Sequence, residues 1–250
     1  MLHNLAMAYF ALFVEVDQRM HPRDRICEFL GGDAGLADVA LTALRDTAFR
    51  DDLPEADETI SFHAESRHHF LAYPVLASLD LLQAESPSRL DELSGEQKRK
   101  ILSVRYCVAD TLRQDATSEC HDRWLQQDPD LVLDMLYRCA VDALKVGDSN
   151  PPGLYDLDRF NTQVDRSYDI RVRLLRAFPV RAPSTQLPLL DRLLGQVVRF
   201  PDRVALSAVI AKKLKAKSAT DAQKVLCLRR RSIERRFVSS LVAAMRGAGI

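Results

Sequence analysis

Glycine is scarce in this sequence: the 250 residues include nine glycines, and none of the nine is followed by lysine. A Walker A nucleotide site needs glycines whose backbone amides surround the phosphates and a lysine that reaches the terminal group. The sequence therefore excludes that motif. The glycine-rich stretch from Gly31 to Gly35 also lacks GxGxxG spacing and follows an expected helix, so we interpret it as a helix C-cap and turn.

The usual motifs of metal binding and covalent catalysis are missing as well, since the sequence contains no HExxH, no Cys-x-x-Cys and no GxSxG. One local group of histidines is interpreted as a partly exposed helix surface, and it comprises His63, Glu65, His68 and His69, with Glu65 and His69 one turn apart. Cys120 and His121 could pair as thiolate and imidazole, but adjacent helical residues diverge. We expect no catalytic residue, no metal, no cofactor and no enzyme activity.

The cysteines indicate a reducing compartment, and the apolar run near the N-terminus indicates a core helix and no membrane span. Five widely spaced cysteines are an odd number, and they resemble buried thiols more than a disulfide framework: Cys27, Cys107, Cys120, Cys139 and Cys227. The apolar run Leu5–Val14 has no basic residue before it and is too short to span a bilayer, so we expect a core helix there. We therefore expect a cytoplasmic protein without membrane contact.

Strand signals are nearly absent, and apolar residues recur instead with helical spacing. Examples are the patterns over Val132–Val146, Leu187–Val198 and Leu206–Leu214. Helix starts agree with these patterns and are expected at the N-caps Asp128 and Asp202 and at the capping boxes Ser94–Gln97 and Thr220–Gln223.

Glycine and proline divide the chain into many short helices, which form a string of helical hairpins. We predict an all-α fold whose hairpins stack as an α-solenoid of the HEAT/ARM type, and a closed bundle is the alternative. The predicted domains are residues 1–227, a helical-repeat domain, and residues 228–250, a basic C-terminal helix or tail.

The formal net charge of +0 conceals an uneven distribution of charge. Residues 1–70 carry 13 acidic and 6 basic side chains, whereas residues 212–236 carry 10 basic and 2 acidic ones. Such a basic segment either is solvated or attracts phosphate or an acidic partner. The candidate partner-binding residues are Arg229, Arg230 and Arg231 in this segment, together with Arg173 and Arg176, which share a helix face. Salt bridges to nearby acids are the alternative for that last pair.

Two segments resemble a known family. Residues 171–225 contain LLRAFPVR, QLPLLDRLL, DRVALSAVIAKKL and AQKV, and residues 52–82 contain Asp52-Leu53-Pro54 and FLAYPVLA. They resemble the helical-repeat region downstream of the NTPase in large bacterial NACHT-domain proteins, whose repeats read much like LLRAFPTR, QLxxLDxLL, DRxALxxLIxxKL and AQRV. The sequence departs from that family after Val225, where Cys227-Leu228-Arg229 follows.

The resemblance implies a HEAT-like sensor or scaffold region of a STAND-type NTPase, a class associated with antiphage defence, here without the NTPase motifs. Our first hypothesis is a non-catalytic module that binds a protein partner or an NTPase domain. The alternative is a helical repeat that binds nucleic acid through its basic C-terminal segment. A third hypothesis, an all-α enzyme with an unrecognised site, predicts a deep polar pocket with convergent titratable groups.

Overall fold

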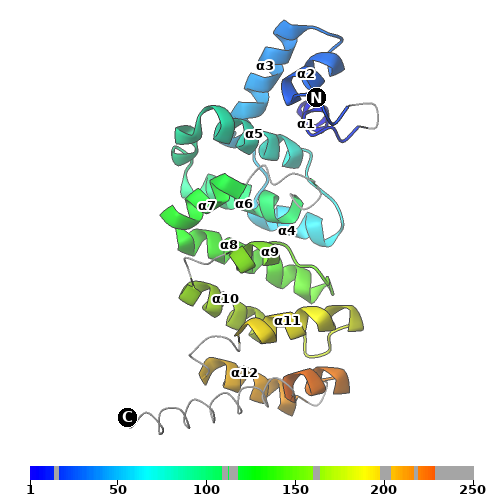
Figure 1. Ribbon diagram of the computed structural model, residues 1–250, viewed down its shortest axis with the longest axis vertical. Helices are drawn as coiled ribbons and strands as arrows, with labels where there is room; N and C mark the ends of the chain where they lie inside the picture. The colour runs from blue at the N-terminus through cyan, green and yellow to red at the C-terminus, as the bar shows by residue number, and fades with distance from the viewer. Residues whose placement is uncertain are drawn as a thin grey trace. The chain divides into compact units, whose positions relative to one another are not determined.

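A computed structural model describes residues 1–13, 17–108, 112, 118–159, 164–197, 204–216 and 219–228 (Figure 1). Within these ranges every regular element is a helix and no β-strand occurs, so the predicted all-α fold is confirmed for them. None of the described helices is both long and apolar enough to cross a lipid bilayer. By its internal contacts the chain divides into two compact units, Met1–Cys139 and Ala140–Ile250. The predicted boundary at residue 228 coincides with the end of the described residues and stays a prediction.

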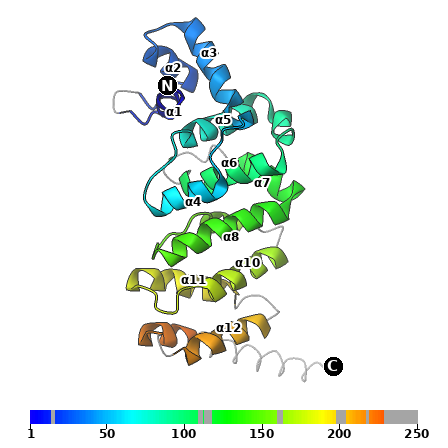
Figure 2. The same ribbon diagram turned by 180° about the vertical axis from the view of Figure 1, so that it is seen from behind.

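Unit 1 consists of α1 (Leu2–Tyr9), α2 (Pro22–Phe29), α3 (Ala34–Arg45), α4 (Ala56–Ala64), α5 (Ala72–Glu85), α6 (Gly95–Val108), α7 (Ser118–Gln127) and the first part of α8 (Pro129–Lys145), with 3₁₀ turns at Asp46–Phe49 and Pro87–Asp91. α5 contacts α1, α3, α6 and α7, and α4 lies along α6 (Figure 2). One core cluster joins α1, α2, α3 and α5 through side chains that include Leu5, Ile26, Leu44, Ala77 and Leu81. The apolar spacing of these helices is therefore explained by burial against one another.

α1 is shorter than the apolar run that predicts it. The expected core helix forms, with Leu5 and Tyr9 buried, but it ends at Tyr9 rather than continuing toward Phe13. Ala11 adopts a left-handed φ of 51°, and the amides of Ala11 and Leu12 return to the carbonyls of Ala8 and Met7. This is a Schellman ending, in which the last helical carbonyls are satisfied by the two residues beyond the cap.

The same ending explains the glycine-rich stretch. Gly31 has φ 75°, and the amides of Gly31 and Gly32 bond to the carbonyls of Glu28 and Cys27 at the end of α2. The predicted C-cap and turn are confirmed, since a residue with positive φ is favoured at this position and glycine adopts it without strain.

The predicted helix starts are also confirmed where the structure describes them. The Asp128 carboxylate accepts the Leu131 amide at 3.1 Å. Ser94 and Gln97 bond reciprocally, and so do Thr220 and Gln223, as capping boxes require. Asp202 lies outside the described residues.

Unit 2 contains the rest of α8, then α9 (Leu154–Arg159), α10 (Val164–Ala177), a 3₁₀ turn at Ser184–Gln186, α11 (Leu187–Val197), α12 (Val204–Lys215) and helical residues 221–228. α10 packs against α11 and α12 (Figure 2). Buried apolar side chains of this unit include Leu174, Phe178, Leu190 and Leu194. The three helices predicted from apolar spacing, now α8, α11 and α12, are confirmed.

Candidate functional site

The candidate partner-binding arginines have different surroundings. Arg173 is half-buried and Arg176 is exposed, and both lie on α10 three residues apart, so they share a face as expected. Arg229, Arg230 and Arg231 lie outside the described residues. Of the two candidates that the structure describes, Arg176 is the more exposed.

Cys120 and His121 do not form a nucleophilic pair. Both side chains are buried in unit 1, and burial raises the pKa of the Cys120 thiol to about 12. His121 Nε2 lies 2.8 Å from the hydroxyl of Tyr106, so the imidazole is engaged by a tyrosine instead of a thiolate. A thiol that stays protonated at neutral pH is a poor nucleophile.

The histidine group differs from the sequence-based interpretation. α4 ends at Ala64 and Ser66 has a left-handed φ of 56°, so Glu65 and His69 do not share a helix. Glu65 pairs with Arg67 at 3.0 Å, while the His69 ring stacks on Phe62. The described part of the chain holds no group of three or more metal-ligating side chains suited to a metal ion.

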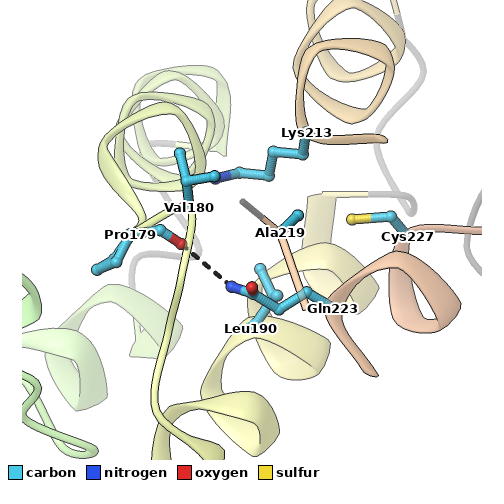
Figure 3. Close-up of a pocket in the computed structure, with 7 residues that line it drawn as sticks. All are labelled: Pro179, Val180, Leu190, Lys213, Ala219, Gln223 and Cys227. Atoms are coloured by element: carbon cyan, nitrogen blue, oxygen red, sulfur yellow. Dashed lines mark hydrogen bonds between the residues drawn. The ribbon is translucent and has the colours of Figure 1, made fainter. Parts of the chain in front are cut away.

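A small hollow in unit 2 lies among three helices and the turn after α10 (Figure 3). Its cavity volume is about 10 Å³, roughly the space that one water molecule needs. Small-molecule sites usually enclose roughly 300–1,000 Å³. The lining residues are Pro179, Val180, Leu190, Lys213, Ala219, Gln223 and Cys227.

Lys213 points across this hollow toward the end of α10 (Figure 3). Its Nζ donates to the carbonyl of Phe178 at 2.9 Å and lies 5.7 Å from the centre of the Phe178 ring. Burial lowers the pKa of the Lys213 ammonium and raises that of the Cys227 thiol. The carbonyls at a helix C-terminus carry partial negative charge, so a lysine donor suits this position.

Both the nitrogen and the oxygen of the Gln223 side-chain amide form hydrogen bonds beside the hollow. Its Nε2 donates to the Pro179 carbonyl at 3.1 Å (Figure 3). Its Oε1 accepts the Thr220 amide at 3.2 Å. The polar groups that line the hollow are thus occupied by the chain itself. They are not a convergent set of free titratable groups of the kind an enzyme site requires.

The contacts of Lys213 and Gln223 with the end of α10 form one junction between helices, and a second set of side-chain to main-chain contacts lies earlier in unit 2. The fully buried Gln186 donates from Nε2 to the carbonyls of Leu144 at 3.0 Å and Asp148 at 2.8 Å. Arg171 on α10 donates to the Leu157 carbonyl of α9 at 2.7 Å and to the Ser167 hydroxyl at 2.8 Å. Lys213 and Gln223 bind the adjacent carbonyls of Phe178 and Pro179, just after α10. Gln186 and Arg171 instead bind two separate segments, Gln186 the end of α8 and the turn after it, and Arg171 the Leu157 carbonyl of α9.

The two junctions follow the order of the chain. We group the helices of unit 2 as three successive pairs, α8 with α9, α10 with α11, and α12 with residues 221–228. Arg171 and Gln186 connect the second pair to the first, and Lys213 and Gln223 connect the third pair to the second.

Only part of this arrangement could be predicted from the sequence. The capping box predicted the bond between Thr220 and Gln223, but nothing local indicated that the other half of the Gln223 amide reaches Pro179. Nothing in the sequence indicated which carbonyls Gln186 binds, because they lie about 40 residues earlier. No family model, curated protein or solved structure matches this chain.

Proposed function

We propose that the chain is a non-catalytic helical-repeat scaffold or sensor module that binds a protein partner, with its helical pairs stacked as an α-solenoid. The observation that carries the proposal is that in the second and third pairs of unit 2 a cation and a glutamine bind carbonyls of the pair before. In a repeat array each pair contacts only its neighbours, so the same type of contact is expected at successive junctions.

The resemblance to the NACHT-associated repeats supports the same proposal. Each of its four quoted motifs in residues 171–225 contributes a residue to the later junction or its predecessor. LLRAFPVR supplies the Phe178 and Pro179 carbonyls, and AKKL contains Lys213. QLPLLDRLL begins with Gln186, and AQKV contains Gln223. The four motifs thus supply the residues whose contacts hold successive pairs together. The NTPase of such a sensor region would be another domain or another chain.

Protein binding can be tested with the charge of Arg176. We expect the tagged full chain, purified from cells that encode it, to retain one protein in near-stoichiometric amount. Arg176→Glu should reduce that recovery about tenfold, because a charge reversal at a contact commonly costs at least the roughly 1.4 kcal/mol that a tenfold change represents. Arg19→Glu, the same change at an exposed arginine of unit 1, is the control.

Two results would count against this function in different ways. If no protein is retained at near-stoichiometric amount, the scaffold proposal loses its support. If a protein is retained equally by wild type, Arg176→Glu and Arg19→Glu, the chain binds a partner but α10 is not the contact.

The alternative function, nucleic-acid binding, has one favourable observation. Lys212 and Lys215 are exposed at the end of α12, although Lys213 between them is turned toward Phe178. We expect a filter-binding titration with duplex DNA to show weak, sequence-independent binding that disappears near physiological salt, because a few phosphate contacts are strongly screened. Tight binding that persists at about 0.15 M salt would favour the alternative.

A further inference from the structure

One exposed face of α3 is apolar. Leu36, Val39 and Ala43 are exposed, and their i, i+3, i+7 spacing places them along one side of the helix. Phe29, at the end of the neighbouring helix α2, is exposed as well. Another side of α3 packs into the core of unit 1 through Ala37, Ala40 and Leu44. A contiguous apolar stripe, unlike isolated exposed side chains, indicates an interaction surface.

The charges around this face are acidic. Residues 24–44 carry four exposed acids, Asp24, Glu28, Asp33 and Asp38. The one basic residue of this range, Arg25, is buried and donates to two main-chain carbonyls. Arg23, the cation just before the range, is bound to Asp38 through two hydrogen bonds. The other three acids have no ion pair with any described residue, so the surface of α2 and α3 carries unbalanced negative charge.

This combination restricts what can cover the face. Symmetric pairing of two α3 faces would bring two acidic surfaces together, and like charges across an interface disfavour the contact. An amphipathic helix binds such a face by its apolar side chains, and basic side chains beside them would match the acids. The face therefore fits a segment that is both amphipathic and basic.

The chain itself contains a segment of this chemistry. Residues 229–250 lie outside the described residues, and their sequence has six basic side chains and one acidic one. Ile233, Phe237 and Leu241 recur there at every fourth position, the spacing of one helix face. The predicted partner-binding residues Arg229, Arg230 and Arg231 begin the segment.

We propose that residues 229–250 of one copy bind the α3 face of a second copy, formed by Leu36, Val39 and Ala43. The apolar side chains of the segment cover this face, and its arginines lie close to the acids of α2 and α3. Because the two contacting surfaces differ, the contact is heterologous and joins copies head to tail. Arg176 of α10 takes no part in it, so failure of this proposal leaves the proposed binding of another protein untouched.

The test is light scattering of the full chain during size-exclusion chromatography, at concentrations well below and well above a dissociation constant of about 10 µM. We expect the wild-type mass to rise above that of one chain at the higher concentration. Val39→Lys should weaken association at least about tenfold, because it removes an apolar contact and places a positive charge against the arginines. Its circular dichroism should match wild type, since Val39 is 66 % exposed.

Val146→Lys is the matched control. Val146 is 62 % exposed, close to the exposure of Val39, and lies just after α8 in unit 2. The substitution adds the same charge to the chain, so this variant should associate as wild type does. Equal loss of association in both variants would overturn the proposal, because the effect would then come from net charge alone.

Mixing two variants identifies the contacting surfaces. Phe237→Glu alters the segment and leaves the α3 face intact, and it should keep the mass of one chain, as Val39→Lys does. An equimolar mixture of the two should reach the mass of two chains, because one variant supplies an intact segment and the other an intact face.

Three results would overturn the proposal. The first is a wild-type chain that keeps the mass of one chain at both concentrations, and the second is a Phe237→Glu variant that associates as wild type does. The third is a mixture of Val39→Lys and Phe237→Glu that stays at the mass of one chain although wild type associates.

Discussion

Replacing Gln186 with alanine is expected to lower the free energy of unfolding of unit 2 by about 2–4 kcal/mol. The side chain is fully buried, and its amide is a donor to the carbonyls of Leu144 and Asp148. Alanine removes two hydrogen bonds, each of which contributes about 0.5–1.5 kcal/mol, and leaves a cavity in place of the amide. The Leu144 carbonyl keeps its bond from the Gly147 amide at 3.3 Å. Urea unfolding followed by far-UV circular dichroism measures the change.

Gln97→Ala is the matched control for that substitution. Gln97 also uses its side-chain amide at a helix start, but it accepts a single bond, from the exposed Ser94 amide at 3.0 Å. Loss of a cap costs about 1 kcal/mol. If Gln186→Ala destabilises the chain no more than Gln97→Ala does, the buried junction does not hold the helical pairs together.

Arg25→Met should lower the free energy of unfolding of unit 1 by about 3 kcal/mol. The Arg25 side chain is 5 % exposed and donates from Nη1 to the Tyr9 carbonyl at 2.7 Å and from Nη2 to the Gln18 carbonyl at 2.6 Å. Methionine fills much of the same volume but leaves both carbonyls without a charged donor. Trp124 fluorescence during urea unfolding reports the loss.

Arg23→Met is the control for Arg25→Met, because it removes the same positive charge two residues away, at an exposed position. Arg23 pairs with Asp38 on the surface through two hydrogen bonds, and both side chains are substantially exposed. Surface ion pairs contribute little, so the midpoint should stay close to that of wild type. Equal losses in Arg23→Met and Arg25→Met would contradict the role assigned to the buried arginine.

Local features of the sequence predicted much of the fold. Apolar residues at helical spacing indicated α8, α11 and α12, and the capping boxes at Ser94 and Thr220 marked helix starts that the structure confirms. These signals are reliable because a helix and its cap depend on residues within one or two turns of each other.

The remaining features depend on residues far apart in the chain. α1 ends at Tyr9 although the apolar run continues, and the guanidinium of Arg25 occupies the Tyr9 carbonyl. His121 follows Cys120 in the sequence, but its Nε2 lies 2.8 Å from the hydroxyl of Tyr106, fifteen residues earlier. The carbonyls that accept hydrogen bonds from Gln186 could not be predicted from the sequence either. A single sequence carries no pattern for such contacts, because the packing of helices decides them.

The central claim is that the chain forms a repeat array whose pairs are held by their neighbours. Hydrogen exchange of the Gln186→Ala variant tests this claim most directly. We expect exchange to accelerate relative to wild type at the end of α8 and in α10 and α11, while the amides of α1, α2, α3 and α5 keep their wild-type protection, since coupling in a repeat array extends mainly to adjacent pairs. A uniform loss of protection through both units would contradict the account, because it would mean that the chain folds around one shared core.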